Sequence, residues 1–221
     1  MMKAKERKAD KLLFVLSVDT EEEFDWEGGF PQENCSVDNI RYLPEFHQFC
    51  ESLNIRPTYM VDYPVASTAE SAAIIKDILA RGNAEVGAHL HPWCTPPIEG
   101  PNTERESHVI NLPAKLIRRK LEVLLAAIED NIGVRPTVFR TGRWGIDGKV
   151  LQILIDYGFK VDSSVYPYYS NQYFSCRDAC DQPYWPNLAK PNYPGTQRKI
   201  FELPITSGFN RPDFPFWEKV H

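Results

Sequence analysis

Short apolar runs alternate with longer segments of helical periodicity along most of this chain. A short apolar run that ends in polar residues is typical of a buried strand, whereas apolar residues that recur every three or four positions predict an amphipathic helix. The sequence predicts strands over residues 12–19, 58–61, 85–90, 137–140, 160–162 and 199–203. It predicts helices over about 38–53, 68–81, 113–132 and 147–157. This alternation favours an α/β fold with a parallel sheet, either a barrel or a doubly wound sheet.

The remaining segments divide into a tail and loops. Residues 1–10 carry several lysines and arginines offset by acids, which predicts a flexible N-terminal tail. Proline is concentrated in 92–101 and again in the long stretch that begins near 166, so both are expected to be loops. A long ordered loop such as 166–195 usually serves a function, for example lining a cleft. Nothing suggests a linker between two domains before residue 163, so residues 11–221 are expected to form a single domain.

Composition excludes several classes of protein. The chain has 221 residues, of which 43% are hydrophobic and 25% charged, as in soluble proteins with a sizeable core. A net charge of −5 argues against a nucleic-acid partner. The longest apolar run, within 12–18, is far shorter than the roughly 20 residues of a membrane span and lacks a cleavage site for export. The five cysteines are an odd number, which fits free thiols and a cytoplasmic location.

Polar side chains follow four of the predicted strands at the point where each strand ends. Asp19 ends the first strand, His89 and His91 end the third, Arg140 ends the fourth and Asp162 ends the fifth. In barrels and in open parallel sheets, the cleft lies at the carboxyl ends of the strands. We therefore expect these side chains to line one cleft.

His89 and His91 are candidate metal ligands. Residues two apart on an extended chain point to the same side, so both imidazoles can reach one ion. With a carboxylate as third ligand and one open position, this is the arrangement of a catalytic zinc site. A divalent metal ion, zinc above all, is the cofactor that this spacing suggests. Two histidines at the end of a strand can also be ordinary surface residues.

The acidic cluster after the first strand contains a candidate base. Asp19 ends an apolar strand, where a half-buried carboxylate needs a partner, and Glu21 shares its side of the chain. Glu22 and Glu23 are interpreted as a solvated loop. Arg140 and Asp162 are either a buried salt bridge or part of the site. In the second case Arg140 keeps Asp19 ionised, as a general base requires, and Asp162 orients the guanidinium through a bidentate pair.

Four motifs occur in the order found in one known family. They are Leu16-Ser17-Val18-Asp19, Gly87-Ala88-His89-Leu90-His91-Pro92-Trp93, Phe139-Arg140-Thr141-Gly142-Arg143-Trp144-Gly145 and Val161-Asp162-Ser163-Ser164-Val165-Tyr166-Pro167. Together they resemble the polysaccharide deacetylases of carbohydrate esterase family four over about residues 12–205. The resemblance implies a distorted (β/α) barrel of seven strands. It also implies metal-dependent removal of an acetyl group, most often N-acetyl, from a sugar in a polysaccharide or glycan precursor.

The chain departs from the family pattern in its first three motifs. Thr20 stands where the family has a second aspartate, which functions as a metal ligand, and Glu21 would take that role one position later. The histidines are two apart rather than four, so Trp93 occupies the place of the second. Thr141-Gly142 follows Arg140 where the family has proline, which implies a different local turn.

The family's last motif is also missing from the expected place. That motif carries a late histidine that donates a proton, but the only histidine after His108 is His221, the final residue. Either the chain is cut short of that motif, or another group donates the proton, or the enzyme is impaired. The resemblance, together with the aromatic stretch 214–221, favours the first, a barrel that lacks its last elements in a domain that is incomplete at its C-terminus.

The resemblance implies a carbohydrate substrate, for which several aromatic residues are candidate contacts. Trp93, Trp144 and Tyr166 lie in the motifs, and they are interpreted either as walls for sugar rings or as core residues. Two rival functions stay open. One is a non-catalytic carbohydrate-binding or regulatory protein on the same fold, and the other is a different metal-dependent amidohydrolase on a barrel.

Overall fold

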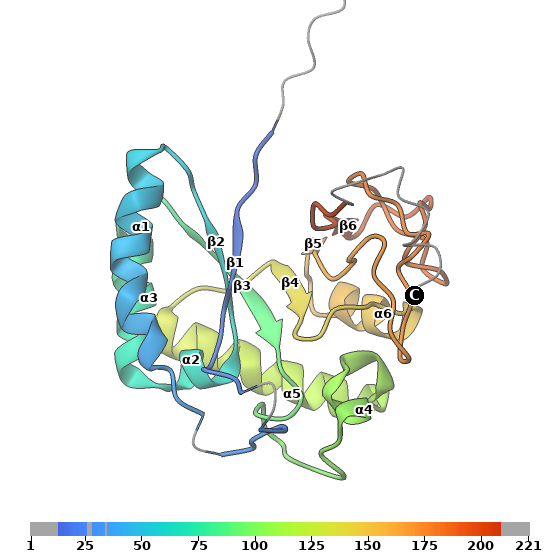
Figure 1. Ribbon diagram of the computed structural model, residues 1–221, viewed down its shortest axis with the longest axis horizontal. Coiled ribbons are helices and arrows are strands. Elements are labelled where there is room, and N and C mark those ends of the chain that lie inside the picture. Colours follow the sequence, from blue (N-terminus) through green and yellow to red (C-terminus); the bar gives the residue numbers. More distant parts are fainter. Residues whose placement is uncertain (1–12, 26–27, 34, 209–221) are drawn as a thin grey trace, which may run out of the picture.

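The computed structural model describes residues 13–25, 28–33 and 35–208, and a single row of parallel strands forms its centre (Figure 1). Each strand hydrogen-bonds to the next one along the chain, so the order in the sheet follows the order in the sequence. The strands are β1 (Ser17–Thr20), β2 (Thr58–Val61), β3 (Glu85–Leu90), β4 (Val138–Thr141), β5 (Val161–Asp162) and β6 (Phe201–Glu202).

This order decides between the two predicted architectures. A doubly wound sheet reverses its strand order at a switch point, whereas a barrel adds strands in one direction. Every neighbouring pair from β1 to β6 is parallel and in sequence, as in a barrel. Within the described residues β1 does not pair with β6, so the row of six strands remains open. The prediction of a distorted α/β barrel is confirmed in this form.

Helices connect the strands and lie outside the sheet (Figure 1). The longer helices are α1 (Leu43–Ser52), α3 (Ala69–Ala80), α5 (Ala114–Ala127) and α6 (Gly148–Asp156). Short helical segments are η1 (Asp38–Tyr42), α2 (Tyr63–Ser67), α4 (Glu104–Ser107), η2 (Val109–Asn111) and the π-helical turn η3 (Ile128–Ile132). None of the described helices combines the length and apolar character needed to cross a membrane.

The predicted helices correspond closely to the observed ones. Helix α5 with its π-helical extension spans nearly all of the predicted segment 113–132, and it ends at Gly133. Gly133 adopts a left-handed φ of 89°, which glycine reaches without steric cost, and its N–H bonds the carbonyl of Ile128. Periodicity does not predict the short helices α2 and α4, because four or five residues are too few to display a helical period.

The first strand is shorter than predicted. The expected strand over 12–19 assumes that its whole apolar run is buried, but Leu13, Phe14 and Val15 are exposed and precede the strand. Pairing begins at Ser17 because its neighbour β2 begins at Thr58, which stands opposite Ser17 in the register. The predicted tail 1–10 and the aromatic stretch 214–221, including His221, lie outside the described residues.

One continuous hydrophobic cluster holds the strands and helices together. It joins alternate residues of the central strands to the inner faces of α3, α5 and α6, with Leu121, Leu124 and Val150 all fully buried. Burying a leucine side chain contributes about 1.5–3 kcal/mol. This packing fixes the strands relative to one another, and with them the side chains at their carboxyl ends.

Candidate functional site

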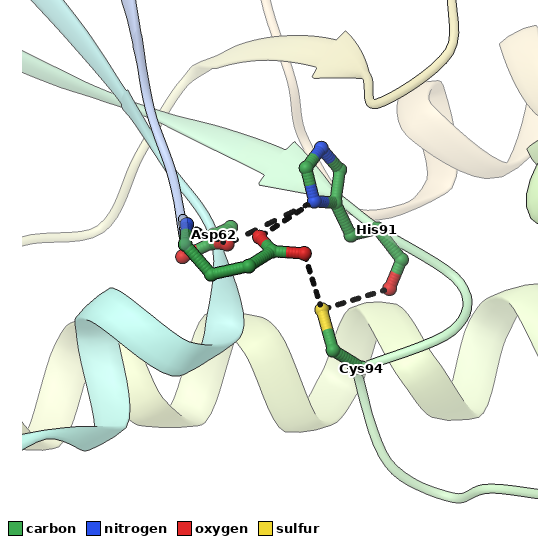
Figure 2. Close-up of side chains that lie close together, drawn as sticks. Asp62, His91 and Cys94 are labelled. Atoms are coloured by element: carbon green, nitrogen blue, oxygen red, sulfur yellow. Dashed lines mark hydrogen bonds and ion pairs between the residues drawn. The ribbon is translucent and has the colours of Figure 1, made fainter. Parts of the chain in front are cut away.

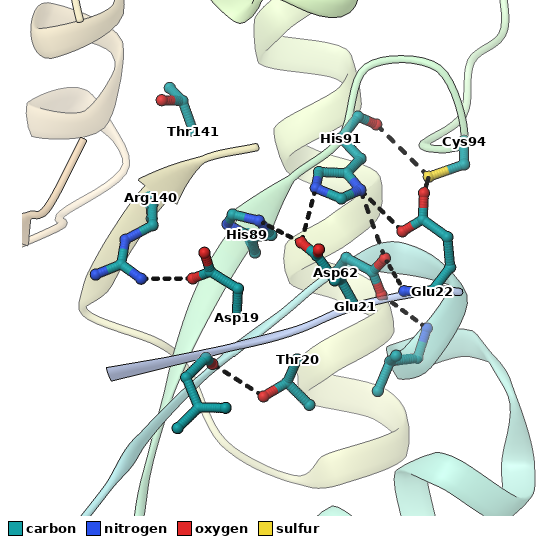
Figure 3. Close-up of polar contacts among 12 residues, drawn as sticks. Asp19, Thr20, Glu21, Glu22, Asp62, His89, His91, Cys94, Arg140 and Thr141 are labelled. Carbon is teal, nitrogen blue, oxygen red and sulfur yellow. Dashed lines mark hydrogen bonds and ion pairs between the residues drawn. The ribbon is translucent and has the colours of Figure 1, made fainter. Parts of the chain in front are cut away.

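The carboxyl ends of β1, β3 and β4 bring the predicted polar residues together (Figure 3). Asp19 lies in β1 and Glu21 follows it, His89 lies in β3 and His91 follows it, and Arg140 lies in β4. Adjacent strands place His89 opposite Arg140 in the register. The local reason is the alternation of side chains along a strand, which directs Asp19 and Glu21 to one side and Thr20 to the other.

A carboxylate and two imidazoles form the centre of this cluster. Oε2 of Glu21 lies 3.0 Å from Nε2 of His89 and 3.1 Å from Nε2 of His91. His89 and His91 are almost completely buried, whereas the side chain of Glu21 is 29% exposed. The three ligand atoms therefore converge at a point that is closed on the histidine side and accessible on the side of Glu21.

The charges at this point favour a cation. Burial raises the pKa of Glu21, but hydrogen bonds from His89 and His91 outweigh it and bring the pKa down to about 2. Burial lowers the pKa of His91, but its contacts with Glu21 and Glu22 outweigh burial and raise the pKa to about 10. Without a metal, protons on imidazole balance the carboxylates. Two imidazole nitrogens and one carboxylate with an open side are the donor set of a catalytic zinc site, so these residues fit a divalent ion.

Glu22 is buried, and its interpretation as a solvated residue is wrong. Its side chain is only 2% exposed. One carboxylate oxygen lies 2.8 Å from Nδ1 of His91, and the other accepts a hydrogen bond of 2.8 Å from Nε1 of Trp93. Burial raises the pKa of Glu22, but its contacts with Asp62, His91 and Trp93 outweigh burial and hold the pKa well below its usual range. The solvated interpretation does hold for Glu23, which is exposed.

Trp93 packs inside the protein and does not face a ligand, so its predicted place in a sugar-binding wall is wrong. It is 2% exposed, and its ring stacks on the imidazole of His91 at a centroid distance of 4.2 Å. Phe24 and Phe30 cover it from the other sides. Trp93 therefore packs against the ring of His91, a candidate metal ligand, and helps to hold it in place.

A further acidic residue, Asp62, contacts Glu22 and lies near His91, with its Oδ2 3.8 Å from Nδ1 of His91 (Figure 2). Asp62 caps the N-terminus of α2: its Oδ1 accepts from the backbone N–H of Val65, and its Oδ2 accepts from that of Glu22. Burial and the charge of Glu22 raise the pKa of Asp62 well above its ordinary value. Sequence reasoning missed Asp62, although its position just after the second predicted strand matches the pattern of the other site residues.

Arg140 holds Asp19, as predicted. Its guanidinium is 3% exposed and bonds the Oδ1 of Asp19 at 2.5 Å. The remaining donors go to Ser17 and Ser163: Nε bonds the Ser163 carbonyl at 3.0 Å, and one terminal nitrogen bonds both hydroxyls. Arg140 is thus held by several hydrogen bonds and directs one edge of its guanidinium to Asp19. The two residues form a well-oriented charge pair beside the cluster.

Asp162 does not form the predicted bidentate pair with Arg140. Its Oδ1 accepts from the hydroxyl of Ser164 instead, and the side chain is completely buried. In the register of β5 and β6 it stands opposite Glu202, which is also buried. The arginine donors are already taken by Ser163, one position later, so Asp162 lies in the wall behind the site rather than among the groups that face a substrate.

The carboxyls of Asp162 and Glu202 are both buried and lie opposite each other on neighbouring strands. Burial raises the pKa of both groups, and the charge of Asp162 raises that of Glu202 further. We expect the free energy of unfolding to fall as the pH rises above about 4.3, where the unfolded glutamic acid loses its proton while the folded protein keeps it. Glu202→Gln mimics the protonated acid and should remove this part of the pH dependence.

Urea unfolding at a series of pH values between about 4 and 9 would measure the effect, since this range begins near the ordinary pKa of a glutamic acid. The stability curve of Glu202→Gln should be flatter than that of the wild type, so that the variant gains relative stability as the pH rises. Glu70→Gln, at the exposed N-terminal end of α3, is the control and should shift the curve without changing its slope. Parallel curves for Glu202→Gln and the wild type would contradict a raised pKa of Glu202 in the folded protein.

Trp144 and Tyr166 border the Asp19–Arg140 pair. The Arg140 guanidinium lies 5.1 Å from the centre of the Trp144 ring, and the Tyr166 ring meets Trp144 edge-on at 5.3 Å. Tyr169 stacks on Tyr166 at 5.0 Å. Trp144 has a φ of 58°, the left-handed conformation that side-chain-bearing residues rarely adopt. Unlike Trp93, both Trp144 and Tyr166 are partly exposed.

Two small residues explain departures from the family pattern. The hydroxyl of Thr20 bonds the carbonyl of Val18, away from the imidazoles, so Glu21 provides the carboxylate that faces them (Figure 3). A Cβ atom on Gly142 would lie 2.0 Å from Cδ2 of His91. The turn after Arg140 therefore requires glycine at this position, because the backbone passes directly against the His91 ring.

His108 is not positioned as a proton donor. It is 1% exposed, and its ring contacts Tyr173 and Phe174 at centroid distances of 4.7 and 5.7 Å. Burial and the nearby charge of Arg143 lower its pKa to about 4. His108 is therefore a neutral residue of the protein interior.

Comparison with known proteins gives structural but not sequence matches. The sequence matches no known family profile and no curated protein. A candidate polysaccharide deacetylase from Mycobacterium smegmatis superposes with a TM-score of 0.52 at 22% identity, over 74% of this chain and 45% of that one. IcaB from Ammonifex degensii superposes with a TM-score of 0.51 at 16% identity, over 93% of this chain and 70% of IcaB. A candidate glycoside hydrolase/deacetylase from Parabacteroides distasonis superposes with a TM-score of 0.54 at 15% identity, over 86% of this chain and 44% of that protein.

These matches establish the architecture. The chain spans about half the length of two of these proteins and 70% of the third. At such low identities the common property is the fold. This chain therefore has the α/β fold of these candidate deacetylases and of IcaB.

Proposed function

We propose that this chain is a metal-dependent hydrolase that removes an acetyl group, most directly an N-acetyl group, from a sugar in a polysaccharide or glycan precursor. The observation that carries the proposal is the position of two separate units side by side. One is the Glu21–His89–His91 cluster and the other is the Asp19–Arg140 pair, and both lie at the carboxyl ends of β1, β3 and β4.

Glu21, His89 and His91 would hold the ion. A divalent ion bound there supplies a Lewis acid for an acyl carbonyl and a water molecule of increased acidity. The buried histidines exclude solvent on one side, while the partly exposed Glu21 side leaves access for a substrate. Zinc suits the nitrogen-rich donor set better than magnesium or calcium, which prefer oxygen ligands.

Asp19 is the proposed general base. Its carboxylate is 29% exposed and lies two residues from Glu21 on the same side of the chain, so it can accept a proton from water at the mouth of the site. Arg140 binds one oxygen of Asp19 and thereby orients the other. A general base in such a position typically contributes about 10²–10⁴-fold to a rate, or about 3–5 kcal/mol.

Trp144 and Tyr166 are the proposed contacts for the sugar. They stand beside the Asp19–Arg140 pair, are partly exposed, and belong to two different loops after β4 and β5. A cavity of 320 Å³ continues from Tyr166 between Tyr169 and Ser207. An aromatic face of this kind suits the apolar face of a sugar ring, while the hydroxyls remain accessible to polar groups and water.

Metal analysis followed by acetate release tests the proposed function. The purified protein should contain close to one equivalent of divalent metal and should release acetate from acetylated amino-sugar oligomers. A chelator should stop the release, and added zinc should restore it. Oligosaccharide binding without acetate release would instead favour the non-catalytic carbohydrate-binding function, and release of ammonia or ring opening from cyclic amides would favour a different amidohydrolase.

A further inference from the structure

The imidazole of His91 has a carboxylate on each side. Glu21 lies at Nε2, where the proposed ion would bind, and Glu22 lies at Nδ1 on the opposite side (Figure 3). Glu22 is not one of the three convergent ligands, and its side chain is buried behind the site. Its direct contact with the site is its hydrogen bond to the imidazole of His91.

Two N–H groups converge on the Glu22 carboxylate from different directions. Oε2 lies 2.8 Å from Nδ1 of His91, and Oε1 lies 2.8 Å from Nε1 of Trp93. The Trp93 indole can only donate. Both carboxylate oxygens can only accept when ionised, so the group satisfies both donors only if His91 carries a proton on Nδ1.

We propose that Glu22 is a positioning residue that keeps the proton of His91 on Nδ1 and so leaves Nε2 free to bind the metal ion. This inference rests on the metal site of the proposed function. A metal-binding histidine commonly donates its second ring N–H to a carboxylate, which fixes its tautomer and ring orientation. Here the carboxylate that binds the N–H of His91 belongs to Glu22, the residue next to Glu21. The segment after β1 therefore provides one ligand candidate, Glu21, and also holds a second one, His91, in place.

Glu22 is itself held in place by the surrounding structure. Its backbone N–H bonds the Oδ2 of Asp62, which caps α2 through its other oxygen. Trp93 stacks on the face of His91 while it bonds Glu22, and Gly142 lies against the edge of the same ring. The imidazole thus has no room to flip, and its proton position is determined by what Glu22 can accept.

The same contacts argue against a second metal ion among Glu22, Asp62, His91 and Cys94. These four residues offer ligand atoms close together (Figure 2). However, each of the four carboxylate oxygens already lies 2.8–3.0 Å from a nitrogen that can donate a hydrogen bond. A cation would have to displace these donors, so the group is a hydrogen-bonded support rather than a metal centre.

Glu22→Gln is the decisive variant. A glutamine amide has the shape of the carboxylate but only one accepting oxygen, so it cannot accept from both His91 and Trp93. With Trp93 fixed as a donor, the amide NH₂ faces His91, and the proton of His91 moves to Nε2. We expect the dissociation constant for zinc, measured by competition with a chromophoric chelator, to rise about 10–100-fold. Glu23→Gln removes the same charge from the exposed neighbouring residue and should leave it unchanged within a factor of about two.

Removing the competing donor should rescue the amide. In Trp93→Phe the indole N–H is absent, so the amide introduced by Glu22→Gln can turn its oxygen to His91 and its NH₂ toward the phenyl ring. The effect of Glu22→Gln on zinc affinity should therefore shrink several-fold in the Trp93→Phe background, as a double-mutant cycle would show. An equal effect in both backgrounds would overturn the tautomer argument and leave only lost charge as the cause.

Nitrogen-15 NMR of the His91 ring provides a reading independent of metal affinity and of folding in the Trp93 variant. The wild type should show a proton on Nδ1 with or without zinc, and metal-free Glu22→Gln at high pH should show it on Nε2. A proton that stays on Nδ1 in Glu22→Gln would overturn the inference. If the wild type binds no zinc, the proposed function fails. The NMR measurement still shows, in that case, whether Glu22 determines which nitrogen of His91 carries the proton.

Discussion

His89→Ala and His91→Ala should each remove most of the bound metal and lower acetate release at least about a thousandfold. Among the described residues, each ring provides one of three convergent ligand atoms, and the two nitrogens lie 3.0 and 3.1 Å from the same oxygen of Glu21. Two remaining ligands hold a divalent ion poorly, and loss of a Lewis acid costs several kcal/mol of transition-state stabilisation, of which about 1.4 kcal/mol corresponds to a factor of ten. Metal content by elemental analysis and initial rates of acetate release measure the two effects.

His47→Gln is the matched control. His47 is as buried as the two ligand candidates, but it bonds the hydroxyl of Tyr59, away from the cluster. The control variant should keep its metal even if its stability falls, which separates loss of a ligand from loss of a buried histidine. A double variant of His89 and His91 that keeps full metal occupancy would show that the ion binds elsewhere.

Asp19→Asn should keep the metal and lose turnover. The amide preserves the size of the side chain but cannot accept a proton, and the three metal-ligand candidates stay in place. The expected loss in kcat is about 10²–10⁴-fold, the usual contribution of a general base, with a zinc dissociation constant within a few-fold of the wild type. Kinetics with saturating zinc and a separate zinc titration distinguish the two quantities.

The comparison variant for Asp19 is Asp38→Asn. Asp38 is exposed at the start of η1, so its substitution removes the same charge without touching the site. Its kcat should equal that of the wild type. If Asp19→Asn instead loses metal as completely as the histidine variants, Asp19 is a ligand, and the base must be sought elsewhere.

The frame of the site is predictable from the sequence. Periodicity places six strands within a few residues, and the rule that parallel strands present their carboxyl ends together brings Asp19, His89 and Arg140 to one place. Alternation along an extended chain correctly puts Glu21 on the side of His89. These are short-range regularities, and they are visible wherever a strand is long enough to show its period.

The support of the site cannot be predicted in the same way. Three consecutive glutamates have no periodicity, so the sequence suggests a solvated Glu22, and only the turn of the chain after β1 shows that this side chain points inward. An aromatic residue after a motif, such as Trp93, is equally compatible with a ligand-facing wall and with the core. Whether a side chain faces a cleft or the core depends on distant segments, here Phe24 and Phe30.

Asp162 shows a third limit, which is competition for one partner. From the sequence alone it is a reasonable partner for Arg140, since both lie at the ends of neighbouring strands. In the structure Ser163 provides a carbonyl and a hydroxyl that take the guanidinium donors first. Asp162 then faces Glu202, a residue of the last described strand whose role no local pattern indicates.

The separation of the site residues along the chain has a consequence for folding. The bond between Arg140 and Asp19 joins residues 121 positions apart, and that between His89 and Glu21 joins residues 68 apart. Contacts of such high order form late and slow the folding of a domain, because the entropy of closing long loops must be overcome before they form. No single strand–helix unit can assemble the cluster by itself. A ligand that binds the complete cluster would therefore stabilise only chains whose first four strands have already paired, and its binding would report the completion of that step.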